Sequence, residues 1–255
     1  MSIIKNEIPI LEYDTDDKAV IMPNHEDLEI ELPERGVLAF LGKTVKDYAV
    51  SHSAIQVANF DSITKLFPLY VLKHKGYDVC LIQAPVGASA AVQILDWLNA
   101  YGTTKVISSG SCGVLEHMEE NTFLVPYRAL RDEGASYHYM EPSRFVDVDR
   151  RALKAIETAL TDHGYRYQEV ITWSTDGFYR ETKDLVEYRK QDGCKVVEME
   201  CSALAACAKL RGSIWGEILF TGDTLADADN YDERSFGKDS MDKALELCLD
   251  AVIKL

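Results

Sequence analysis

Apolar and polar residues along this chain alternate in a way that separates short strands from longer helices. We expect buried strands in the short apolar runs at 36–41, 77–86, 105–107, 123–130, 168–173 and 217–221. We expect amphipathic helices where apolar residues recur three and four apart, at 89–101, 150–163 and 240–255. Strand, loop of small residues, helix and strand follow one another, as in a mostly parallel sheet. Ligands of such sheets bind at the carboxyl ends of the strands.

The stretch from Val196 to Gly212, VVEMECSALAACAKLRG, organises the rest of the pattern. It predicts a buried strand, a sharp junction and a buried helix that ends at a glycine. The junction carries two carboxylates, Glu198 and Glu200, on either side of Met199. A helix start stabilises an anionic side chain, and an ionised carboxylate can accept hydrogen bonds from two neighbouring hydroxyls, as on a ribose. The alternative is a helix-start charge with no further role.

Composition narrows the class of protein. With 255 residues, 47% of them hydrophobic, the chain is long enough for one large domain, which we place at 36–255 behind a polar, acidic arm at 1–35. The net charge of −15 argues against nucleic acid or an anionic membrane as a partner. No signal peptide or membrane-spanning run is evident, so we expect a cytoplasmic protein. Six cysteines without a CxxC pair indicate reduced thiols, and no metal site.

Four short motifs carry a resemblance to a known family. They are GSCG at 110–113, FY at 178–179, EME at 198–200 and GD at 222–223, in that order. Together they resemble the nucleoside phosphorylase family, which includes uridine phosphorylase, hexameric purine nucleoside phosphorylase and related nucleosidases. The resemblance spans 36–255. It implies a single-domain α/β fold with a central mixed sheet flanked by helices, phosphate as co-substrate with no cofactor, and a homo-oligomer, either a dimer or a hexamer.

The resemblance also implies roles at the nucleoside. Glu200 would hold the ribose hydroxyls, and Met199 would lie against the sugar. Phe178 would stack on the base, with Tyr179 beside it. His25 in the arm would cross to a neighbouring subunit and meet the ribose 5′-hydroxyl; a solvated surface histidine is the alternative.

The base that leaves is expected to be a purine. Purine-acting members of the family carry an Asp where Asp223 stands, and this Asp hydrogen-bonds purine N7 and donates a proton as the glycosidic bond breaks. An acid serves this role when its pKa lies near the working pH, so we expect burial to raise the pKa of Asp223. Arg234 resembles the family Arg that approaches this Asp when the site closes.

The phosphate site departs from the family pattern. Gly42, Gly110 and Ser111 match residues that bind phosphate in the family through backbone amides and a hydroxyl. Lys46 stands where the family has one Arg, and Ser108 where it has another. Lysine is a point charge without the two-pronged geometry of arginine, and serine carries no charge. Both changes therefore weaken the site for phosphate.

The leading hypothesis is therefore a phosphorylase of purine nucleosides, with three alternatives. Uridine phosphorylase is favoured by the DEGASYHY segment but lacks the residues that read uracil. A nucleosidase that uses water is favoured by the loss of the two arginines, although no base is evident in the first loop. A non-catalytic nucleoside-binding protein would keep the ribose pocket without turnover.

Overall fold

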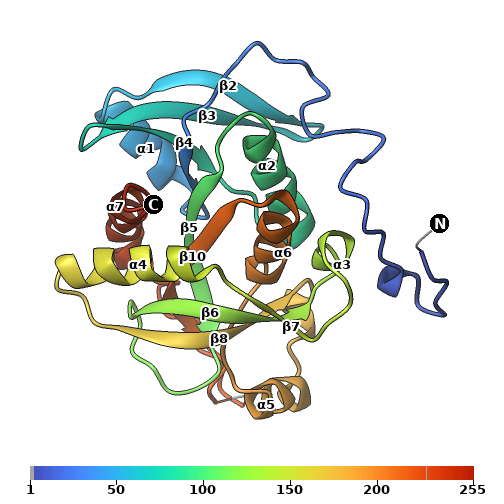
Figure 1. The fold of residues 1–255 in the computed structure, drawn as a ribbon. Helices are drawn as coiled ribbons and strands as arrows, with labels where there is room; N and C mark the ends of the chain where they lie inside the picture. The colour runs from blue at the N-terminus through green and yellow to red at the C-terminus, as the bar shows by residue number, and fades with distance from the viewer. Residues whose placement is uncertain (1–2, 228) are drawn as a thin grey trace.

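The computed structural model describes residues 3–227 and 229–255, in which ten strands form one sheet with helices on both faces (Figure 1). The strands are β1 Arg35–Ala39, β2 Ile55–Ser62, β3 Lys65–His74, β4 Tyr77–Gln83, β5 Lys105–Val114, β6 Phe123–Asp132, β7 Phe145–Asp147, β8 Tyr167–Thr175, β9 Cys194–Glu198 and β10 Ile214–Thr224. The helices are α1 Lys43–Ser51, α2 Ala88–Ala100, α3 Ser136–Tyr139, α4 Arg150–Asp162, α5 Lys183–Gln191, α6 Cys201–Arg211 and α7 Met241–Val252. The expected α/β fold with a mixed central sheet is confirmed.

The sheet closes on itself at one end. Its strand order is β10-β6-β8-β9-β5-β1-β4-β3-β2, and β10 also pairs in parallel with β5. Five strands therefore form a closed barrel, from which β1, β4, β3 and β2 extend as an open wing. The barrel matters for function because the carboxyl ends of β5, β9 and β10 come together at one opening.

Helices cover the two faces of the sheet in separate layers. Helices α2 and α6 pack on one face around Trp97, Leu204 and Trp215. Helices α1, α4 and α7 pack on the other face, where Phe220 and Leu245 are fully buried. The small residues of α6 explain its place at the centre, because a helix that is apolar or small on every side can be buried all round.

Most of the predicted elements are present, with two corrections. The segment after β1 was expected to be a phosphate-binding loop but forms α1 from Lys43. The family's proline is absent from this segment, so nothing disfavours a helix immediately after Gly42. The expected loop at 108–113 is instead part of strand β5, which pairs with β10 along most of that length. The hairpin of β2 and β3 and helix α5 were not predicted.

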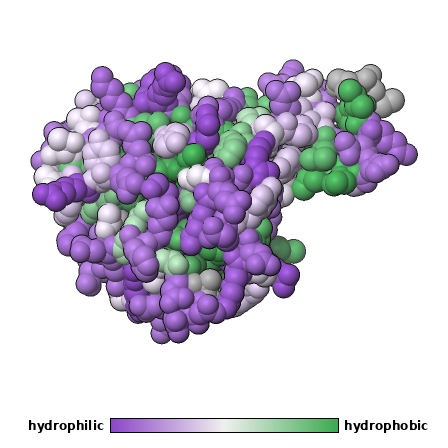
Figure 2. All heavy atoms as spheres, turned by 90° about the horizontal axis from the view of Figure 1, so that it is seen from below, coloured by the Kyte–Doolittle hydropathy of each residue, from purple (hydrophilic) through white to green (hydrophobic). Residues whose placement is uncertain are grey.

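The arm extends away from the domain body (Figure 1). Apolar side chains are exposed along it, including Ile4, Ile8, Val20 and Ile21, and Figure 2 shows apolar atoms on the projecting segment. Of the helices in the described residues, none is long and apolar enough to cross a membrane. All six cysteines are buried and free, as expected.

A charged cluster joins the ends of α4 and α7 to the turn after β3. Asp250 accepts hydrogen bonds from His74 and His163, each at 2.6 Å, and pairs with Lys75 at 2.6 Å. Burial favours the neutral acid, but the hydrogen bonds from Lys75 and the two histidines outweigh it and hold the pKa of Asp250 well below its usual value. This cluster lies outside the cavity described below.

Candidate active site

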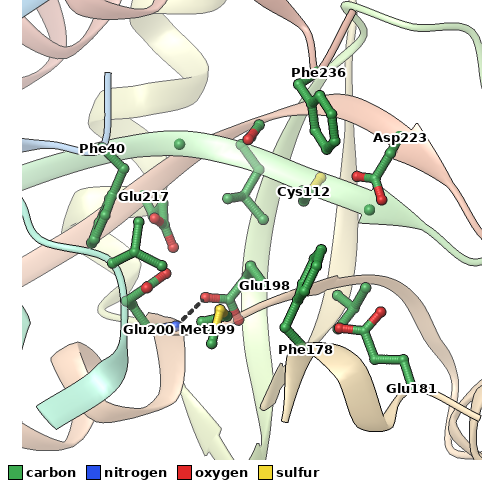
Figure 3. Close-up of a pocket in the computed structure, with 16 residues that line it drawn as sticks. Phe40, Cys112, Phe178, Glu181, Glu198, Met199, Glu200, Glu217, Asp223 and Phe236 are labelled. Carbon is green, nitrogen blue, oxygen red and sulfur yellow. Dashed lines mark hydrogen bonds between the residues drawn. The ribbon is translucent and has the colours of Figure 1, made fainter. Parts of the chain in front are cut away.

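A cavity of about 170 Å³ opens where β5, β9 and β10 end (Figure 3). Six of the residues singled out from the sequence line it: Gly110, Ser111, Phe178, Met199, Glu200 and Asp223. They come from parts of the chain more than a hundred residues apart. The fold therefore assembles one site from motifs that were read separately.

Glu198 holds the junction between β9 and α6 in place. One carboxylate oxygen accepts hydrogen bonds from the backbone N–H groups of Glu200 and Cys201, both at 2.6 Å. The other accepts from the hydroxyls of Ser174 at 2.5 Å and Thr172 at 3.2 Å. These bonds satisfy the first N–H groups of α6, which have no partner within the helix. Glu198 is thus a structural carboxylate that fixes the position of its neighbours.

Glu200 follows as the N-cap residue of this helix, with its carboxylate in the cavity. The N–H of Gly87, at the start of α2, donates to Glu200 Oε1 at 2.5 Å. Gly87 has a φ of 103°, which favours glycine. Burial, with the nearby Glu198 carboxylate adding to it, raises the pKa of Glu200 to about 8. The Met199 backbone also donates a hydrogen bond to the Glu200 carboxylate, and Glu200 lies beside Met199 in the cavity (Figure 3).

The opposite end of the cavity carries Asp223 and Phe178 (Figure 3). Burial raises the pKa of Asp223, as expected, although a hydrogen bond from Tyr231 and the charge of Arg234 act in the other direction. Arg234 itself donates to the backbone carbonyls of Gly222 at 3.2 Å and Met118 at 2.8 Å. Its guanidinium is thus near Asp223 but is held by the backbone.

Four other residues singled out from the sequence lie outside this cavity. Gly42 and Lys46 are exposed at the start of α1 and do not line it. Tyr179 is 93% exposed and stacks edge-on against Phe178, lining a neighbouring hollow with Tyr231. His25 lines a separate cavity of about 310 Å³ between the arm, β2 and α2. Their assigned roles stay predictions.

The cavity also contains residues that the sequence did not single out. Glu217 and Glu181 line it, together with the aromatic rings of Phe40 and Phe236. Glu181 lies near Asp223, and burial, with the charge of that Asp adding to it, raises its pKa to about 7. Glu217 was read as the start of a buried strand. A carboxylate inside an apolar strand is rarely buried without a purpose, and this signal was available in the sequence.

The charge of the cavity is strongly one-sided. Five carboxyl groups line it: Glu181, Glu198, Glu200, Glu217 and Asp223. Among the described residues of this lining there is no lysine, arginine or histidine. Ser108, at the position of a family arginine, is buried and accepts a hydrogen bond from the indole N–H of Trp215 at 2.9 Å. The expected cationic phosphate site is therefore not formed by the residues of this cavity.

A family model described as the phosphorylase superfamily matches residues 34–255. The chain belongs to this superfamily. Its match covers the whole sheet and every residue of the cavity, which confirms the resemblance that the four motifs carried. Superfamily membership agrees with a cavity built at the carboxyl ends of parallel strands.

Individual superfamily members are distant relatives of this chain. It is 26% identical to a guanosine phosphorylase of Halorubrum lacusprofundi over 189 residues, which is 71% of this chain and 78% of the relative. It is also 26% identical to a uridine phosphorylase of Thermococcus kodakarensis over 194 residues, 71% of this chain and 68% of the relative. The fold matches that of an AMP nucleosidase from Bacteroides thetaiotaomicron with a TM-score of 0.72, at 20% identity and covering 87% and 88% of the two chains.

Proposed function

We propose that this chain cleaves the N-glycosidic bond of a purine nucleoside, with phosphate or water as the acceptor of the ribosyl group. The observation that carries the proposal is the placement of Glu200 and Asp223 at opposite ends of one buried cavity. One carboxylate suits the sugar hydroxyls and the other suits the departing base. Relatives that act on guanosine and uridine agree with a nucleoside substrate and leave the base to be argued from the site.

Ribose recognition rests on Glu200 and Met199. A carboxylate has about four acceptor positions, so Glu200 can accept from the 2′- and 3′-hydroxyls while it holds the backbone amides of Gly87 and Met199. The Met199 side chain gives the sugar ring an apolar surface beside it. These contacts position C1′ without a covalent bond to the protein, so catalysis relies on orientation.

Departure of the base rests on Asp223. The transition state has ribosyl-cation character, so the leaving purine is stabilised when N7 receives a proton or a strong hydrogen bond. Burial raises the pKa of Asp223 toward the range where an acid can donate. Phe178 lies beside it and offers a ring face to the base. A pyrimidine has no N7, and we therefore favour a purine.

Phosphate would lie at Gly110 and Ser111 on β5. The Ser111 hydroxyl and backbone amides of this segment are neutral donors. Hydrolysis by water is a second candidate, and the cavity charge favours it. Five carboxyl groups and no cation in the described lining make a doubly charged anion costly to hold there.

Product analysis tests the proposal. Inosine, guanosine, adenosine and uridine are each incubated with the protein, with and without phosphate, and the products are separated by chromatography. Release of a purine is the expected result; ribose 1-phosphate beside it would identify phosphate as the acceptor, and free ribose would identify water. Asp223→Asn should slow release by about 10² to 10⁴, and Asp78→Asn, an exposed carboxylate on β4 that pairs with Lys73, is the matched control. Full activity in the Asp223 variant would refute its role, and uridine cleavage alone would refute the purine assignment.

A further inference from the structure

Glu217 is a buried carboxyl group whose bonding is incomplete. It lies on β10 in the wall of the cavity and is 1% exposed. Its Oε2 atom has no hydrogen-bond partner among the described residues. Leaving such an oxygen unpaired costs roughly 1–3 kcal/mol, so a ligand or a water is expected to reach it.

The groups around Glu217 offer no cation. In the register of the sheet it lies beside Ser108 of β5, whose hydroxyl is already bonded to Trp215. The thiol of Cys201, the first residue of α6, interacts with the Glu217 carboxyl group. The further ionisable groups whose charge interacts with it are Glu198, Glu200, Cys112 and Cys248. Glu217 is therefore held by a thiol on one side and left free on the other.

Three of the other four carboxyl groups of the cavity have partners, and the fourth, Glu181, lies near Asp223. Glu198 accepts four hydrogen bonds and caps α6. Glu200 is held by Gly87 on the ribose side, and Asp223 by Tyr231 at the base end. In Figure 3, Glu217 and Asp223 lie at opposite sides of the cavity, with Glu200 on the side of Glu217 and Glu198 toward the middle. A nucleoside bound between the two ends would present C1′ with its base directed to Asp223 and its other face toward Glu217.

We propose that Glu217 is a catalytic base that activates a water molecule for attack on C1′, so that the cavity hydrolyses nucleosides without phosphate. The inference rests on the proposed nucleoside cleavage and selects water from its two candidate acceptors. The water oxygen forms a bond to C1′ as the bond from C1′ to the base nitrogen breaks, and that electron pair stays with the base. Glu217 takes the proton from water, and Asp223 gives one to the base. The sum is nucleoside and water giving free ribose and free base.

The chemistry of Glu217 suits this task. Burial raises its pKa well above the usual value, with Glu198 and Glu200 adding to the effect. A carboxylate that binds a proton more tightly than an ordinary glutamate is, once ionised, the stronger base toward water. Glu217 lies beside Ser108, where the family has an arginine. Because serine carries no charge, the positive charge that would attract phosphate is absent at this position. The same substitution that weakens phosphate binding thus leaves room for water.

The test follows inosine and guanosine cleavage in phosphate-free buffer made with ¹⁸O-labelled water. The wild-type chain should release base and free ribose that carries the label at C1, at a rate that added phosphate does not raise. Glu217→Gln should lower this rate by about 10² to 10⁴. Glu246→Gln, an exposed glutamate on α7, is the matched control and should keep the wild-type rate. Thermal unfolding of each variant checks its fold.

A second variant guards against misfolding of the first. Glu217→Ala opens space beside the cavity, and added formate should restore part of its hydrolysis, because formate can replace the missing base. Base release that requires phosphate and gives ribose 1-phosphate would overturn the inference and leave the proposed nucleoside cleavage standing, with phosphate as its acceptor. Wild-type hydrolysis that persists in Glu217→Gln, or an inactive folded Glu217→Ala without formate rescue, would overturn the role of Glu217. No release under any condition would instead refute the proposed cleavage itself.

Discussion

Nucleoside affinity is expected to rise with pH because Glu200 must ionise to accept the ribose hydroxyls. The pKa of Glu200 in the free protein is about 8, raised first by burial and then by Glu198. A protonated carboxyl group has to lose its proton before it can accept from both hydroxyls. At pH 6 only about 1% of the free protein is then ready to bind, so the apparent Kd should be about 100-fold weaker than above pH 9 and about 10-fold weaker at pH 7.

Calorimetric titration with a nucleoside analogue that the protein does not cleave measures this dependence between pH 6 and 9. The logarithm of Kd should fall by about one unit per pH unit below the pKa. Two controls isolate Glu200. An analogue without the 2′- and 3′-hydroxyls should bind with little pH dependence, and so should the Glu200→Gln variant. A flat profile for the wild type between pH 6 and 8 would refute the assignment of Glu200 to the ribose.

Two further predictions concern stability, and one concerns the space that the cavity leaves for the base. The pKa of Glu200 is higher in the folded protein than in the unfolded chain, so the wild type loses stability as the pH rises toward 8. Glu200→Gln should therefore be more stable than the wild type by about 1–3 kcal/mol at pH 8 in urea unfolding, and no more stable at pH 4. Gly113→Ala places a Cβ 2.9 Å from Leu225 and 3.4 Å from Asp223, so kcat/KM for purine nucleosides should drop roughly 10- to 100-fold; unchanged kinetics would place the base elsewhere. Asp250→Asn should lower the free energy of unfolding by about 1–3 kcal/mol at pH 7. The pKa of Asp250 is lower in the folded protein than in the unfolded chain, so its stabilising effect is present at neutral pH and is lost in acid. An equal loss of stability at pH 2 would contradict this.

The nucleoside end of the site could be predicted because its residues belong to local patterns. A β-branched run followed by EME and small residues predicts a strand and a helix, and the structure has β9 and α6 there. Phe178 and Asp223 each follow or end a predicted strand. Since the carboxyl ends of neighbouring strands share one edge of the sheet, such residues converge even when they are far apart in sequence.

The acceptor end could not be predicted in the same way, because it depends on which strands become neighbours. Lys46 matches a family position by counting, but α1 places it on an exposed helix face. The predicted loop at 108–113 continues as strand β5, since its small residues fit the closed barrel between β9 and β10. At Gly110, for example, an added Cβ would lie only 3.1 Å from the Cβ of Phe40, so a larger residue would be crowded there.

Glu217 shows what the pairing of strands in the sheet adds to the pattern of apolar and polar residues in the sequence. In the sequence it is a carboxylate in an apolar run, which marks it as unusual but does not show which residue lies beside it. The unpaired state of its carboxyl group is explained by the neighbouring strand β5, where the residue beside it is Ser108 and not the family's arginine. An arginine there would pair with Glu217 and satisfy it, and a serine committed to Trp215 does not. The changed residue on one strand and the unpaired oxygen on its neighbour are therefore one feature, and in our proposal this feature favours water over an anion as the acceptor of the ribosyl group.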